Sequence, residues 1–151
     1  MNGTSTSTST GTSASTDIVT GTNTDDGQDV RGVLDRLYSA WADYDADAFA
    51  ALYTEDATVV MPGVFNDGRE EIRAYIAAAF EGPLKGSRPL DEPRRIRFPR
   101  PGTAVVVSEA GILLAGESEV PADRQRRATW VLVRDPAAGT WAITSYHNAA
   151  L

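Results

Sequence analysis

Apolar side chains recur with helical spacing soon after the polar start of the chain. Counted from Val30, they fall at positions 0, 3, 4, 7, 8, 11 and 14, which is one face of an amphipathic helix. These residues are Val30, Val33, Leu34, Leu37, Tyr38, Trp41 and Tyr44. In the acidic stretch that follows, Asp45 or Asp47 can cap a short second helix over residues 45–53. The pattern therefore predicts two consecutive helices.

The next segments alternate between strand and helix. The run ATVVM at 57–61 predicts a short strand that stops at Pro62-Gly63. Residues 69–80 predict a third helix, with two glutamates in its first turn, where the helix dipole favours them. The third helix is followed by a predicted loop that contains Lys85.

Strand-like runs fill the rest of the chain. They cover residues 94–98, 103–114, 127–134 and 141–148, with the turn DPAAG between the last two. Helices followed by a block of hairpin-connected strands favour an α+β layer over a parallel, doubly wound sheet. We expect a single α+β domain over residues 28–151, preceded by a flexible tail of Ser, Thr and Gly over residues 1–27.

Composition narrows the functional classes. A net charge of −7 argues against nucleic acid and anionic membranes as partners. No run is apolar enough to span a bilayer and the start lacks the features of a signal peptide, so we expect a cytoplasmic protein. The chain has no cysteine and a single histidine, His147, and no ligand spacing suggests a metal site. We expect neither a metal nor a cofactor.

Three stretches resemble a known superfamily. They are WADYDADAFAALYTEDATVVMPG at 41–63, GREEIRAYIAAAF at 68–80 and TWVLVRDPAAGTWAITSYHN at 129–148. They resemble the nuclear-transport-factor-two-like (SnoaL-like, cystatin-like) superfamily. With EGPLKGSR at 81–88, the chain looks closest to the SgcJ/EcaC group of enediyne polyketide biosynthesis clusters and related actinobacterial genomes.

The resemblance implies a cone-shaped, curved antiparallel sheet wrapped around three N-terminal helices. Such a cone usually encloses one pocket, and the fold commonly forms homodimers through the convex face of its sheet. Apolar residues on both faces of the runs 103–114 and 127–134 favour a homodimer as well. The basic stretch at 94–100 is either a solvated strand or a docking surface for an acidic partner, such as a carrier protein of a polyketide synthase.

An aromatic pocket would suit an extended, apolar, conjugated ligand. We expect the substrate-binding residues to be Tyr38, Trp41, Tyr53, Met61, Glu109 and Trp130. Each of the aromatic residues could instead be a core filler.

His147 is the first candidate for acid–base catalysis, because histidine titrates near neutral pH. It shares strand parity with Trp141, Ile143 and Ser145, so we expect it inside the cone at the rim, with Asn148 as the second catalytic candidate. A satisfied core histidine and a solvated one at the strand end are the alternatives.

Three functions stay open at this point. The first is a cofactor-free isomerase, cyclase or hydrolase that acts on a polyketide or polyene intermediate. The second is a non-catalytic accessory protein that binds the polyene or assists the synthase. The third is a structural dimer whose cone is filled by side chains. A strand aspartate like that of the steroid-isomerase-like enzymes is missing from the predicted strands, and Glu109 is the remaining acidic candidate there.

Overall fold

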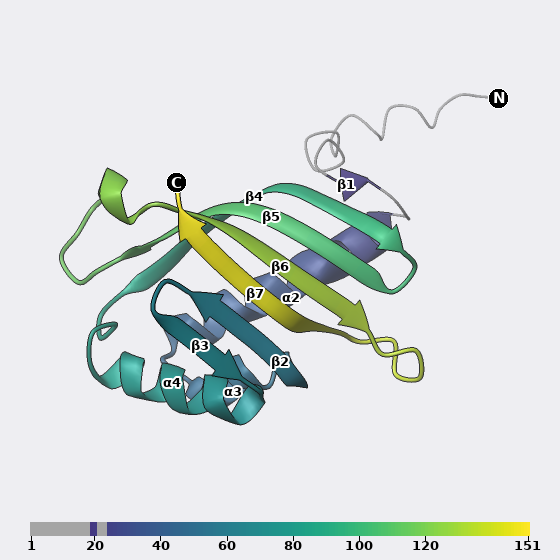
Figure 1. Ribbon diagram of the computed structural model, residues 1–151, viewed down its shortest axis with the longest axis horizontal. Helices are drawn as coiled ribbons and strands as arrows, with labels where there is room; N and C mark the ends of the chain where they lie inside the picture. Colours follow the sequence, from purple (N-terminus) through teal and green to yellow (C-terminus); the bar gives the residue numbers. More distant parts are fainter. Residues whose placement is uncertain (1–18, 21–23) are drawn as a thin grey trace.

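The computed structural model describes residues 19–20 and 24–151, and Figure 1 shows their arrangement. The elements in chain order are β1 (Val19–Thr20), α2 (Thr24–Ala42), α3 (Ala46–Ala50), β2 (Tyr53–Met61), β3 (Val64–Asp67), α4 (Arg69–Glu81), β4 (Arg88–Arg100), β5 (Thr103–Leu113), the 3-10 turn η1 (Ala122–Arg124), β6 (Arg126–Arg134) and β7 (Trp141–Ala150). Three helices and a block of strands are therefore present, in the order that the sequence predicts.

The described strands form one curved seven-stranded sheet in the order β1-β4-β5-β6-β7-β2-β3 (Figure 1). The α+β class with a curved sheet is thus confirmed. The sheet is not antiparallel throughout, because β2 runs parallel to β7 and β1 runs parallel to β4. The edge strand β3 was not predicted.

The three helices lie on one side of the sheet (Figure 1), and buried apolar residues of the helices and strands form one core. Trp41, Phe49 and Phe80 pack edge-to-face, with ring centroids 5.7–6.2 Å apart. The indole Nε1–H of Trp41 donates a buried hydrogen bond of 3.0 Å to Ser87 Oγ. This bond joins α2 to the start of β4, so the core also fixes where β4 begins.

Helix α2 begins at Thr24, earlier than the predicted residue 28. Asp25 and Asp26 occupy its first turn, where the helix dipole favours negative charge. Asp26 is buried, and its Oδ1 lies 3.6 Å from the guanidinium of Arg134 on β6. This long-range ion pair connects the first turn of α2 to β6. Apart from β1 and the start of α2, the predicted tail lies outside the described residues.

Strand β4 is much longer than the predicted run at 94–98. It includes Pro89 and Pro93, which pair with Ile112 and Ser108 of β5. Proline is tolerated on a strand that has a free side, because its missing N–H can face away from the partner strand. Among the described residues, β1 covers β4 only at Ile96 and Arg97, so the free side extends along the first half of β4.

A β-bulge interrupts β7. Ile143 pairs with Leu132, but Ser145 pairs with Val131, so Thr144 is the extra residue. An extra residue moves every later side chain to the opposite face. Trp141 and Ile143 are therefore buried in the core, while beyond the bulge the inward residues are Tyr146 and Asn148.

Candidate functional site

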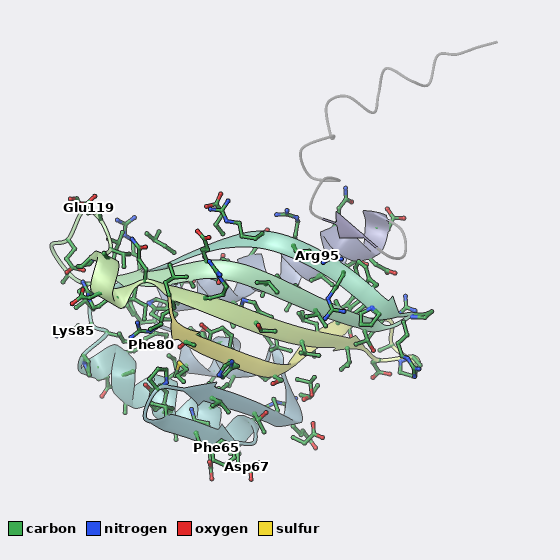
Figure 2. All side chains as sticks on the ribbon, turned by 45° about the horizontal axis from the view of Figure 1, so that its top comes forward. Phe65, Asp67, Phe80, Lys85, Arg95 and Glu119 are labelled. Atoms are coloured by element: carbon green, nitrogen blue, oxygen red, sulfur yellow. The ribbon has the colours of Figure 1, made fainter. Side chains whose placement is uncertain are left out.

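A cavity of about 450 Å³ lies between the helices and the inner face of the sheet. Its wall is mostly apolar and aromatic, with residues from α2, α3, α4 and six of the strands. The α4–β4 and β5–β6 loops also line it, with Pro83 and Leu114, and Lys85 and Glu119 mark these loops in Figure 2. The cone is therefore not filled by side chains, which argues against the purely structural alternative.

Small side chains on the central strands leave room for this cavity. On the inner face of β5, Ser108 and Ala110 follow Val106, and Ala128 pairs with Ser108 from β6. Ala110 lines the cavity directly. It pairs with Asp91 on one side and Arg126 on the other. A carboxylate and a guanidinium therefore flank a small residue on the same face.

Four polar atoms gather at this wall without hydrogen bonds of normal geometry. They are Tyr38 Oη, Asp91 Oδ1, Ser108 Oγ and Trp130 Nε1, and all four are buried. The three donors are nevertheless close enough to the Asp91 carboxylate to favour its charged form. Buried polar atoms are normally paired, and unpaired ones need an explanation. A bound molecule that carries an oxygen function would supply the missing partners.

Burial governs the electrostatics of this cluster. It raises the pKa of Asp91 above the ordinary value of 3.8, although Ser108, Tyr38 and Trp130 act in the opposite direction. Burial and the negative charge of Asp91 also raise the pKa of Tyr38, so its hydroxyl stays protonated. The cluster thus combines a carboxylate of increased basicity with a hydroxyl that keeps its proton, and so remains a hydrogen-bond donor, at neutral pH.

A second polar pair lies on β7. Asn148 Nδ2 donates a hydrogen bond of 2.9 Å to the hydroxyl of Tyr146. Burial raises the pKa of Tyr146 to about 12, while Asn148 and the charge of Arg126 lower it. The Tyr146 ring lies 4.2 Å from that of Trp130, between centroids. The two rings form a continuous aromatic wall beside the Asp91 cluster.

Most of the expected site residues do line the cavity. They are Tyr38, Trp41, Tyr53, Met61, Trp130 and Asn148. The indole N–H of Trp41 is already bound to Ser87, so this residue offers the cavity mainly its ring. The structure therefore brings the expected aromatic set together around one space.

The expected position of His147 is wrong. Its side chain is exposed and lies outside the set that lines the cavity. Counted from the pair of Arg134 and Trp141, a regular ladder would put His147 opposite Ala128; the bulge at Thr144 shifts the register by one residue, and His147 pairs with Thr129. Alternate residues of β7 share a face with Trp141 and Ile143 only as far as that bulge.

The expected position of Glu109 is also wrong. Glu109 points to the outer face of the sheet, where its carboxylate lies 2.9 Å from Arg94 and 3.4 Å from Arg127. The Arg94 guanidinium lowers the pKa of Glu109. Glu109 is thus a surface ion-pair residue.

Asp91 is not among the expected site residues, because the predicted loop after the third helix reaches the strand at 94–98. In the structure, Pro89, Asp91 and Pro93 alternate with exposed residues along β4. Two prolines in one run argue against a strand when no neighbouring strands are known. The pocket aspartate on a strand, thought to be missing, is therefore present.

The comparisons with known proteins agree with this architecture. A family model described as SnoaL-like domain matches residues 34–88. A protein of Nostoc punctiforme PCC 73102, a domain of unknown function with a cystatin-like fold, is 27% identical with a TM-score of 0.77, over 86% of this chain and 80% of that chain. An NTF2-like protein of Novosphingobium aromaticivorans with a cystatin-like fold is 22% identical with a TM-score of 0.72, over 84% of this chain and 82% of that one.

A more distant structure carries a functional description. It is a ketosteroid isomerase-like protein of Erwinia carotovora atroseptica, 18% identical, with a TM-score of 0.61 over 78% of this chain and 90% of that one. The comparison with curated proteins gave no match. The findings show the cystatin-like fold and a likeness to the SnoaL-like domain over residues 34–88, and no finding bears on the SgcJ/EcaC subgroup.

The residues that the structure describes contain no group of three or more His, Cys, Asp or Glu side chains that could hold a metal ion. None of the described helices is long and apolar enough to cross a membrane.

Proposed function

We propose that the cavity binds a small carbonyl compound and that Asp91 moves a proton on it, in a cofactor-independent isomerase-type reaction. The observation that carries this proposal is the Asp91 cluster: a cavity carboxylate with a raised pKa, beside three buried donors that lie close to it without hydrogen bonds of normal geometry. A general base is most effective when its pKa lies near the working pH. Burial raises the pKa of Asp91 and so moves it toward neutral pH.

The reaction can be written with these groups alone. The Asp91 carboxylate takes a proton from the carbon next to the substrate carbonyl, and the C–H electron pair moves into an enolate. The hydroxyl of Tyr38 donates a hydrogen bond to the enolate oxygen, and Trp130 Nε1–H is the second candidate donor. The protonated Asp91 then returns the proton to the same carbon or to a more distant carbon of the conjugated system.

The test uses 2-tetralone, a neutral aromatic ketone, in D₂O. Deuterium uptake next to the carbonyl is followed by NMR for the wild type, Asp91→Asn and the control Glu109→Gln, whose carboxylate lies on the outer face. We expect Asp91→Asn to lower the catalysed rate by about a hundredfold or more, and Glu109→Gln to match the wild type. Equal rates for wild type and Asp91→Asn would overturn the proposal.

A non-catalytic binding protein is the second candidate. The mostly apolar wall and the aromatic pair of Trp130 and Tyr146 favour it, because they suit a conjugated ligand without any proton transfer. If this candidate is right, 2-tetralone binds but no variant differs from the uncatalysed exchange rate.

We keep a polyketide or polyene intermediate as the proposed natural substrate. Its support is the resemblance of residues 81–88 and 129–148 to the SgcJ/EcaC group, together with the aromatic wall. A synthase or carrier-protein partner would meet the basic stretch at 94–100, where Arg95 and Arg97 are exposed (Arg95 is labelled in Figure 2). The products of a polyketide synthase with and without this protein test both ideas, and identical products contradict them.

The homodimer also remains a proposal. Half-buried valines on the outer face of β5 and β6 support it, since they leave apolar surface on the convex side: Val105, Val107, Val131 and Val133. Light scattering at micromolar concentration should give twice the chain mass of 16.1 kDa. A monomer mass would contradict the homodimer and would leave the proposal for the cavity unaffected.

A further inference from the structure

Arg126 is a half-buried guanidinium in the cavity wall, and no carboxylate of the described residues forms an ion pair with it. Its one hydrogen bond is a long one, 3.4 Å from Nη1 to the carbonyl oxygen of Gln125. The neighbouring arginines differ, because Arg124 pairs with Glu117 and Arg127 pairs with Glu109. A positive charge is thus left available in a chain whose net charge is −7.

The position of Arg126 is at the mouth of the cavity. Besides the cavity itself, Arg126 borders a neighbouring surface hollow, and it shares both with Asp91 and Ala110. Glu109 also borders that hollow, but its carboxylate is held by Arg94 and Arg127. A ligand group that enters from solvent therefore meets Arg126 before it reaches the aromatic interior.

The sheet register gives the spacing between the two charged groups. Asp91 pairs with Ala110, and Ala110 pairs with Arg126, so two strand spacings separate them. Two such spacings correspond to about 10 Å between backbones. Since the side chain between them is only a methyl group, a flat ligand can lie over Ala110 and reach both.

We propose that Arg126 binds the carboxylate of the substrate, which makes the substrate class an unsaturated or aromatic carboxylic acid with a mostly apolar body. The planar guanidinium presents paired N–H donors that match a carboxylate, and a partly buried site strengthens such a contact. The acid end lies at the mouth, while the body extends along Trp130 and Tyr146. This inference rests on the proposed function of the same cavity and names its substrate class.

The test compares 2-naphthoate with its neutral methyl ester. Binding is followed through the indole N–H resonances, because Trp41 and Trp130 line the cavity, whereas Trp141 is a core residue outside its lining and serves as an internal control. The variant is Arg126→Gln, and the matched control is Arg127→Gln, one residue along and on the outer face.

We expect the wild type to bind the acid more tightly than the ester. Arg126→Gln should weaken acid binding by about ten- to hundredfold and leave the ester unchanged, while Arg127→Gln should behave as wild type. The inference is overturned if acid and ester bind alike, if neither shifts Trp130, or if Arg126→Gln weakens both equally. These outcomes are separate from the exchange of 2-tetralone, which has no carboxylate, so the two proposals can fail independently.

Discussion

Tyr146 and His147 are adjacent in β7 and lie on opposite faces of the sheet: Tyr146 lines the cavity and His147 is exposed. The bulge at Thr144 sets this arrangement, and the Thr144 hydroxyl accepts a 3.1 Å hydrogen bond from that of Thr54 on β2. The β7 part of the cavity wall is therefore built from Tyr146 and Asn148, and the carboxylate among the residues that line the cavity is Asp91 on β4.

Replacing Asp91 should stabilise the protein at neutral pH. Its pKa is raised in the folded state, so the stability that its protonated form provides is present below the ordinary value of 3.8 and is lost as the pH rises through the folded-state pKa. Asp91→Asn removes this loss. We expect its free energy of unfolding to exceed that of the wild type by about 1 kcal/mol at pH 7, and the difference to disappear at acidic pH.

Thermal unfolding of both proteins between pH 3 and pH 7 measures this effect. Glu109→Gln is the control, because the pKa of Glu109 is lowered by Arg94 and its removal gives no gain at neutral pH. An unchanged or lower melting temperature for Asp91→Asn at pH 7 would mean that burial does not raise the pKa of the Asp91 carboxyl.

Tyr38→Phe should lower the rate of 2-tetralone exchange by about a hundredfold and leave the affinity nearly unchanged. The hydroxyl contributes to the enolate more than to the ketone, because it donates to the oxygen on which charge develops. Tyr44→Phe is the matched control, since the Tyr44 hydroxyl donates to the carbonyl of Ser87 instead. A loss of affinity with no loss of rate would assign Tyr38 to binding alone.

Ala110→Leu should block the cavity. The longer side chain enters the space between Asp91 and Arg126, so we expect binding of 2-naphthoate to fall at least about tenfold. Ala149→Leu is the control, because Ala149 lies exposed on the outer side of β7. Titration by NMR measures both, and full affinity in Ala110→Leu would place the ligand elsewhere.

Ser87→Ala should destabilise the fold by about 1–3 kcal/mol, because the buried indole N–H of Trp41 loses its acceptor. Ser87 Oγ also donates to the carbonyl oxygen of Leu84, at 2.6 Å. Ser118→Ala, at an exposed position, should stay within about 0.5 kcal/mol of the wild type in urea unfolding. Equal losses in both variants would contradict the role given to this bond.

Helices α2 and α4 could be predicted from the sequence because each is a long amphipathic run, and the predicted face of α2 is the one buried in the core from Val30 to Trp41. Features that depend on contacts between distant parts of the chain could not be predicted from the sequence. The first turn of α2 is in contact with Arg134, which lies far along the chain. The prolines of β4 are acceptable only because β1 leaves one side of that strand largely uncovered.

The candidate site was predictable in part, because some of its residues belong to amphipathic patterns. Aromatic residues such as Tyr38 and Trp130 stand out in any amphipathic pattern, so they could be found. The face of His147 depends on one extra residue at Thr144, and a bulge leaves no mark in the alternation of a short strand. Asp91 became a candidate only when its segment was seen to be a strand.

The most direct measurement is the pH dependence of 2-tetralone exchange by the His147→Ala variant. The variant contains no histidine, because His147 is the only one in the chain. Our account predicts that the rate still rises with pH and levels off, with a midpoint above the ordinary pKa of an aspartate, 3.8, as burial of Asp91 requires. If the rise disappears together with the histidine, His147 is the base, and the role assigned to Asp91 is wrong.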